Sequence, residues 1–124
     1  MTNDAIPDDV RDFISRHIDS IAQLEALLLL RANPETGRDV AYVAARLYSN
    51  DEEISKVLTR LSEDGLLSYQ GGLYRYESAA EMEESVRRLA ETYRRHLIPV
   101  TNVIHAKSRR IREFADAFKI RKDR

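Results

Sequence analysis

The residue types that most often carry chemistry in small proteins form no catalytic pattern in this sequence. His17, His96 and His105 fall on separate predicted helices without metal-ligand spacing, and the 124 residues include no cysteine. The glycine pair Gly71-Gly72 lies between two short segments of strand-like residues, which is typical of a hairpin turn and not of a phosphate-binding loop. We therefore expect no enzyme, no metal site and no cofactor.

Charge is the other source of chemistry, and it is unevenly distributed. Residues 1–106 hold 12 Lys and Arg against 18 Asp and Glu, whereas residues 107–124 hold 8 against 3. The net charge of −1 therefore hides a basic C-terminal end. Cations at the start of a helix favour an anionic or acidic partner, and Ser108 is a candidate helix cap among them. The candidate anion or partner contacts are Lys107, Arg109, Arg110 and Arg112.

Three uses of this basic end compete. It could clamp phosphates of DNA, adsorb to an anionic membrane surface, or form the solvated rim of a dimer interface. We favour the dimer, because an apolar stripe on a helix of a small protein is usually buried. That stripe consists of Ile111, Phe114, Ala115 and Phe118.

The composition predicts one globular, helix-rich domain over residues 1–124. The chain is 43% hydrophobic and 33% charged, with four glycines and three prolines. Its pI is near 6.3. Nucleic-acid-binding domains typically have a pI above about 9. The N-terminus lacks the basic start and apolar core of a signal peptide, and the longest wholly apolar run, residues 27–30, is too short to span a bilayer. We expect a cytoplasmic protein.

Capping residues and helical spacing predict four helices in the first half. Pro7 suits the first position of a helix over residues 7–17. Ser20 with Gln23 forms a capping box for a second helix, the most buried one, which ends near residue 33. Asp39 caps a third helix, and Ser49 or Asn50 caps a fourth that ends at Gly65.

A hairpin and further helices are predicted after residue 65. The two-residue turn pairs Leu67 with Tyr76 and Tyr69 with Tyr74 on one face, leaving Ser68, Gln70, Leu73 and Arg75 on the other. Helical periodicity returns over residues 78–118, with Pro99 kinking or breaking the helix, before a basic tail at residues 119–124. Acid-to-arginine pairs spaced by four predict a solvated helix face, at Glu83–Arg87, Glu84–Arg88 and Glu91–Arg95.

The order of helices followed by a tight hairpin resembles a known family. Residues 40–47 and 53–67, with the ending Leu61-x-x-x-Gly65-Leu66-Leu67, resemble bacterial winged helix-turn-helix transcriptional regulators of the MarR-like type. The resemblance covers residues 18–77 and implies a mainly α fold with a small β-hairpin, flanked by N-terminal and C-terminal helices. It also implies a regulator that binds double-stranded DNA as a homodimer.

The resemblance places DNA contacts on the fourth helix and the hairpin. The implied contacts are Arg38, Asn50, Ser55, Lys56, Thr59, Arg60, Gln70 and Arg75. Asp51, Glu52 and Glu53 stand where such a surface needs polar or basic residues, although carboxylates also stabilise a helix N-terminus. The alternative is a winged-helix module that has lost DNA binding and binds a protein through this acidic helix or through the basic C-terminal helix.

The flanking helices supply the expected dimer interface. Their apolar residues recur at helical spacing, and one small domain does not easily cover all of them. The predicted interface residues are Phe13, Met82, Val86, Leu89, Tyr93, Leu97, Ile111, Phe114 and Phe118.

Overall fold

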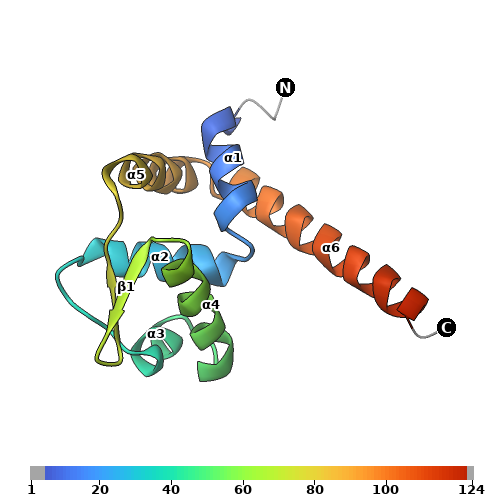
Figure 1. Cartoon of the computed structure of the whole chain (residues 1–124). Coiled ribbons are helices and arrows are strands. Elements are labelled where there is room, and N and C mark those ends of the chain that lie inside the picture. The colour runs from blue at the N-terminus through green and yellow to red at the C-terminus, as the bar shows by residue number, and fades with distance from the viewer. Residues whose placement is uncertain (1–4, 123–124) are drawn as a thin grey trace.

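The computed structural model describes the backbone of residues 5–122 and the side chains of residues 5–117. This part of the chain contains six helices and one antiparallel hairpin, which confirms the mainly helical class with a small hairpin (Figure 1). In chain order the elements are α1 (Asp8–His17), α2 (Ile21–Ala32), α3 (Val40–Arg46), α4 (Asp51–Glu63), β1 (Leu67–Gln70), β2 (Leu73–Tyr76), α5 (Ala80–Arg95) and α6 (Leu97–Lys122).

Side-chain caps begin three of the helices where the sequence predicts them. The Ser20 hydroxyl accepts a hydrogen bond from the Gln23 N–H at 3.1 Å, at the start of α2. The Asp39 carboxylate accepts one from the backbone N–H of Tyr42 at 2.8 Å at the start of α3. Asn50, and not Ser49, caps α4 through its side-chain oxygen. Each cap supplies a partner to a backbone N–H that the helix itself leaves unpaired.

The hairpin has the predicted register and one additional strand-like contact. Leu67 lies opposite Tyr76 and Tyr69 opposite Tyr74. Gly71 and Gly72 have φ of 61° and 82°, which the tight turn requires and which only glycine adopts without strain. In addition, Arg38 forms an isolated antiparallel bridge with Tyr74, with N···O distances of 2.8 and 2.7 Å. The residues just before α3 are thereby attached to the outer edge of β2.

A single apolar core joins these elements, and α2 lies at its centre. Leu24 and Leu27 of α2 are completely buried, as are the inward-facing residues of the neighbouring helices. α2 packs against α4, β2 and α6, while α1 packs against α5 and α6. The largest fully buried side chains outside α2 are Val10, Ile14, Ile18, Ile54, Leu58, Leu61, Leu66, Leu89 and Ile104.

The C-terminal helices depart from the prediction in their boundaries. α5 ends at Arg95 and the break falls at His96, three residues before Pro99. Pro99 instead occupies the third position of α6, where its missing N–H would have no helical acceptor anyway. α6 then runs without interruption through Ser108 and past residue 118 to Lys122, so the predicted helix start at Ser108 and the separate tail from residue 119 are wrong. Residues 123 and 124 of that tail lie outside the described part.

The charges of α5 are not simply a solvated face. Of the three predicted pairs only Glu91 with Arg95 is present, at 3.4 Å, and Arg87 binds Glu84 at 2.6 Å instead. Glu83 pairs with Arg31 of α2 at 2.8 Å and also accepts a hydrogen bond from the Tyr76 hydroxyl. Arg88 pairs with Asp9 of α1. These ion pairs connect α5 to α2 and to α1.

The long helix α6 gives the molecule its shape. Its first half packs on α1 and α2, and its second half extends away from the rest of the chain (Figure 1). Every residue from 109 to 117 is exposed. Within residues 5–122 no helix has both the length and the apolar character needed to cross a bilayer.

Candidate nucleic-acid interface

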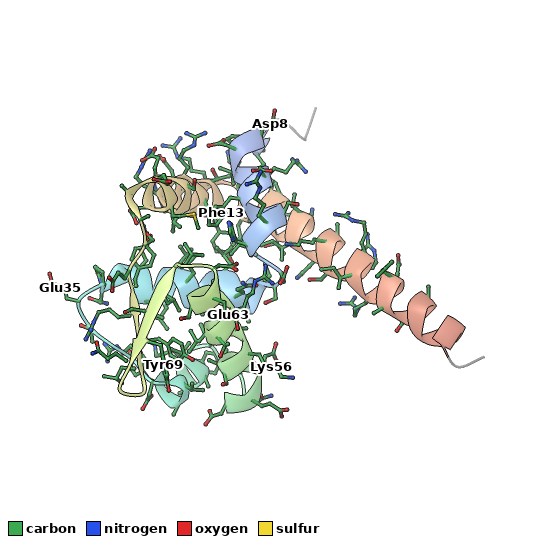
Figure 2. The ribbon with its side chains drawn as sticks, in the orientation of Figure 1. Asp8, Phe13, Glu35, Lys56, Glu63 and Tyr69 are labelled. Atoms are coloured by element: carbon green, nitrogen blue, oxygen red, sulfur yellow. The ribbon has the colours of Figure 1, made fainter. Side chains whose placement is uncertain are left out.

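The outer side of α4 is the surface that the sequence singles out. Ile54, Leu58 and Leu61 bury the inner side of this helix in the core. Ser55, Lys56 and Thr59 are exposed on the other side, and Lys56 stands on the outer side of α4 (Figure 2). Asn50 is exposed too, although its side-chain oxygen is occupied as the helix cap. Four of the predicted contacts therefore lie on one accessible surface.

Arg60, the other cation predicted on this helix, is engaged in ion pairs and does not project freely as the prediction of a DNA contact assumed. Its guanidinium binds Asp19 at 2.7 Å and Asp64 at 3.1 Å, and donates to the backbone carbonyl of Arg16 at 3.0 Å. The cause is tertiary, because the last turn of α4 abuts the loop between α1 and α2. Burial alone would lower the pKa of Arg60, but the two carboxylates raise it above its usual range. Arg60 is thus a structural cation.

The hairpin contributes one free side chain and one confined side chain. Gln70, next to the turn, is exposed. Arg75 is half-buried; its terminal nitrogen lies against Gly37, and its Nε is buried without a hydrogen-bond partner in the described part of the chain. Arg75 is therefore held against the loop before α3 and is less available for the DNA contact that the resemblance implies than an exposed side chain would be.

A basic and aromatic cluster on α3, which we call the α3 cluster, went largely unpredicted. The Arg38 guanidinium lies 4.0 Å from the centre of the Tyr42 ring, and Arg46 donates to the Tyr42 hydroxyl at 2.7 Å. Of these residues, only Arg38 is among the DNA contacts that the resemblance implies. The spacing of four between Tyr42 and Arg46 nevertheless predicts that these two side chains meet on a helix. Arg46 is exposed and adds a cation beside the start of α4.

Tyr48, in the turn between α3 and α4, is the most unusual residue of this region. Its side chain is 97% exposed. With a φ of 55°, it is the one non-glycine residue in the described part of the chain that has a positive φ. A left-handed conformation costs a residue with a β-carbon about 1–2 kcal/mol. We include Tyr48 in the α3 cluster, because it lies just beyond the last turn of α3.

Three exposed carboxylates stand beside these cations. Asp51, Glu52 and Glu53 form the first turn of α4 with their side chains in solvent. They stabilise the helix N-terminus, where the unpaired N–H groups carry partial positive charge. Glu52 and Glu53 line one shallow hollow together with Lys56, so the outer surface of α4 carries both signs of charge.

Among the described side chains of the basic end, up to residue 117, there are one structural lysine and three exposed arginines. The Lys107 ammonium donates to the carbonyls of Ile14, Ser15 and Ile18 at 2.7–2.9 Å and pairs with Asp19 at 2.9 Å. Lys107 closes the end of α1 and has no capacity left for an external anion, which corrects its assignment as a partner contact. The exposed arginines are Arg109, Arg110 and Arg112.

The predicted dimer residues divide in a similar way. Phe13, Val86 and Leu89 are at most 5% exposed and lie in the core of the chain itself, so their assignment to a dimer interface is wrong. Met82 and Tyr93 pack against the same core, and the Tyr93 hydroxyl binds Glu25 at 2.6 Å. Burial and this hydrogen bond raise the pKa of Tyr93 to about 12. The residues that remain exposed are Leu97, Ile111 and Phe114, while the side chain of Phe118 lies outside the described part.

The chain stands apart from the proteins it was compared with. No protein-family model, no curated protein and no solved structure matches it.

Proposed function

We propose that the protein is a winged-helix regulator that binds double-stranded DNA as a homodimer. The observation that supports this proposal best is the arrangement around α3 and α4. Residues 47–50 join the two helices by a short turn, and the hairpin follows α4 directly. The bridge between Arg38 and Tyr74 attaches the segment before α3 to this hairpin, so α3, α4 and the hairpin form one unit.

In this proposal α4 is the helix that enters the major groove. Its 13 residues make a cylinder about 20 Å long, and the major groove is about 12 Å wide. Ser55, Lys56 and Thr59 face the bases, while Gln70 of the hairpin reaches the adjoining backbone. Lys56 is the cation that this helix offers to a phosphate or to a guanine edge.

The α3 cluster supplies the phosphate contacts that α4 lacks. Arg38 and Arg46 flank the same tyrosine, and an arginine held against an aromatic ring keeps its donors oriented for a phosphate. Tyr48 offers a hydroxyl donor at the helix-to-helix turn. A strained, fully exposed aromatic residue that packs on nothing has no evident role in stability, which favours a role in binding.

The exposed carboxylates of α4 favour a second candidate, a winged-helix module that binds a basic protein surface. Near phosphates these three groups oppose binding, because affinity for DNA comes largely from neutralising phosphates. Opposite a basic partner they would accelerate association instead. The carboxylates concerned are Asp51, Glu52 and Glu53.

Fluorescence anisotropy with short labelled duplexes tests the first candidate. Duplexes of random sequence and a pool selected for binding are titrated between about 50 mM and about 200 mM salt. We expect log K to fall linearly with log salt, by about 0.9 per neutralised phosphate. Lys56→Glu and Arg46→Glu should each weaken binding at least tenfold, or about 1.4 kcal/mol.

The matched control is Arg94→Glu, which makes the same charge change on α5, away from α4. This variant should bind duplex nearly as the wild type does. Absence of binding at low salt, or equal losses in all three variants, would contradict DNA recognition through α4 and the α3 cluster.

A further inference from the structure

The outer half of α6 carries apolar side chains that nothing in the described chain covers. Ile111 is 49% exposed and Phe114 is 75% exposed. Both belong to a helical segment that extends beyond the body of the molecule (Figure 1). A short helix that packs on nothing is marginally stable in water, and an exposed phenylalanine adds an unfavourable apolar surface. Both facts point to a partner for this segment.

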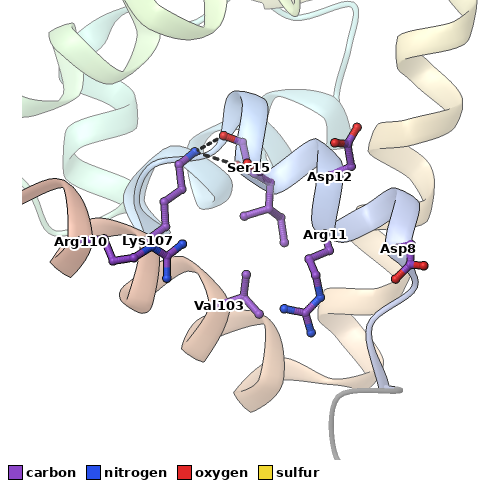
Figure 3. Close-up of a pocket in the computed structure, with 8 residues that line it drawn as sticks. Asp8, Arg11, Asp12, Ser15, Val103, Lys107 and Arg110 are labelled. Carbon is purple, nitrogen blue, oxygen red and sulfur yellow. Dashed lines mark hydrogen bonds between the residues drawn. The ribbon is translucent and has the colours of Figure 1, made fainter.

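A groove lies between α1 and the part of α6 that runs from Pro99 to Arg110, next to the outer segment. It consists of two adjoining hollows of about 440 and 500 Å³ that share Arg11, Val103 and Arg110. Figure 3 shows Val103 between these two arginines, while Lys107 turns away to bind the end of α1. The apolar part of the lining comes from Ile6, Ile14, Pro99, Val103 and Ala106.

The groove and the exposed phenylalanine occupy one face of α6. Val103, Arg110 and Phe114 are separated by seven and four residues, a spacing that keeps side chains on the same side of a helix. This face therefore has a protruding aromatic side chain about one turn beyond the hollow. A two-fold axis across α6 brings the protrusion of each copy to the hollow of the other, which makes the surface self-complementary.

We propose that the groove between α1 and α6 is the docking site for the outer half of α6 from a second copy. The two α6 helices run antiparallel, and the partner's Phe114 lies in the groove over Val103 and Ala106. The contact is reciprocal, so each copy gives one aromatic side chain and receives one.

Some of the charges around the two features are complementary. Arg11 and Arg110 take part in no ion pair within the side chains that the structure describes, and neither do Glu113 and Asp116 beside Phe114. Docking brings these carboxylates of one copy toward Arg11 of the other. It also brings the exposed Arg109 and Arg110 of the two copies near the two-fold axis, so the charge complementarity is confined to the groove. The groove also has carboxylates of its own on α1; Asp12 is paired with Arg16, and Asp8 faces solvent.

This inference deepens the proposed function, since it names the second copy and its docking site. Assembly is measured without DNA, so the two proposals fail separately. A dimer that binds no duplex would contradict only the proposed function. A wild-type chain that stays monomeric at micromolar concentration would overturn the docking site.

Sedimentation velocity of the full chain provides the first test. The wild type should sediment as a dimer, and Phe114→Asp should raise the dissociation constant roughly 30-fold or more, as loss of a central aromatic anchor does. Because Phe114 is mostly exposed, circular dichroism and the melting profile of the diluted monomer should remain those of a folded helical protein. The control is Tyr48→Asp, which alters an even more exposed aromatic residue, in the turn between α3 and α4. Unchanged assembly of Phe114→Asp would overturn the proposal.

Mixing two defective variants tests the reciprocal geometry. Ala106→Glu places a carboxylate in the groove but keeps Phe114, whereas Phe114→Asp keeps the groove. Each variant alone loses both contacts of its dimer. In a mixture, one Phe114 and one intact groove meet, so a heterodimer should form more tightly than either homodimer. No gain on mixing would show that Phe114 does not dock in this groove and would overturn the inference.

Discussion

Lys107 offers the sharpest test of how α6 is held against the body. Its side chain is 14% exposed, and its ammonium group lies within 2.7–2.9 Å of four oxygen atoms. Three of these are carbonyl oxygens of Ile14, Ser15 and Ile18 at the end of α1, and the fourth belongs to Asp19. Three ammonium protons are thus shared among four acceptors.

We predict that Lys107→Met lowers the free energy of unfolding by about 2–4 kcal/mol. Each carbonyl that loses its donor costs about 0.5–1 kcal/mol, since the site is only partly closed to water that can replace the donor. The ion pair with Asp19 contributes about 0.5–1 kcal/mol more at this partly exposed position. Methionine keeps the packing of the lysine stem, so the loss reports on the ammonium group.

The assay is urea unfolding followed by circular dichroism, with the melting temperature as a second measurement. A loss of about 3 kcal/mol is a large share of the ~5–15 kcal/mol typical of a domain and should lower the melting temperature by about 10 °C. The matched control is Lys56→Met, which removes an exposed ammonium and should change stability by less than about 0.5 kcal/mol. Equal stability of the two variants would refute the reasoning.

Three further predictions concern the charges around α4. Arg60→Ala should lower the free energy of unfolding by about 1–2 kcal/mol with little direct effect on duplex binding. Lys56→Ala should weaken duplex binding with little effect on stability. Urea unfolding and anisotropy measurements on both variants check this. Burial alone would raise the pKa of Asp19, but Lys107 and Arg60 lower it below its ordinary 3.8. The stabilising contribution of Asp19 is therefore present above pH 3.8 and is lost as the pH falls through the folded pKa. Unfolding of Asp19→Asn in acid should depend less on pH than unfolding of the wild type. Replacing the three α4 carboxylates Asp51, Glu52 and Glu53 with amides should tighten duplex binding and steepen its salt dependence. Weaker capture of a basic protein partner by the same variant would instead support the second candidate function.

Features set by neighbours in the sequence could be predicted from the sequence. Ser20, Asp39 and Asn50 cap helices because their side chains bind N–H groups three residues ahead. The turn at Gly71 and Gly72 sets the hairpin register, because only one pairing satisfies both strands across a two-residue loop. The apolar stripes of the helices also follow from local spacing.

The identity of each partner across the fold could not be predicted in this way. Arg60 resembled a free cation on an exposed helix, yet it meets Asp19, 41 residues earlier in the chain. Glu83 fitted a local pair with Arg87 and instead binds Arg31. Helical spacing shows which side chains share a face, but an ion pair forms with whichever charge the packing brings nearest.

The candidate surfaces show the same division. Sequence alone determined that α4 presents Ser55, Lys56 and Thr59 on one polar face, and that apolar stripes line the flanking helices. Only the tertiary structure decided that Phe13 and Leu89 lie in the core while Phe114 is exposed. The physical reason is that the hydrophobic effect favours removing an apolar side chain from water but does not specify which surface covers it. The covering surface depends on where the packed helices end.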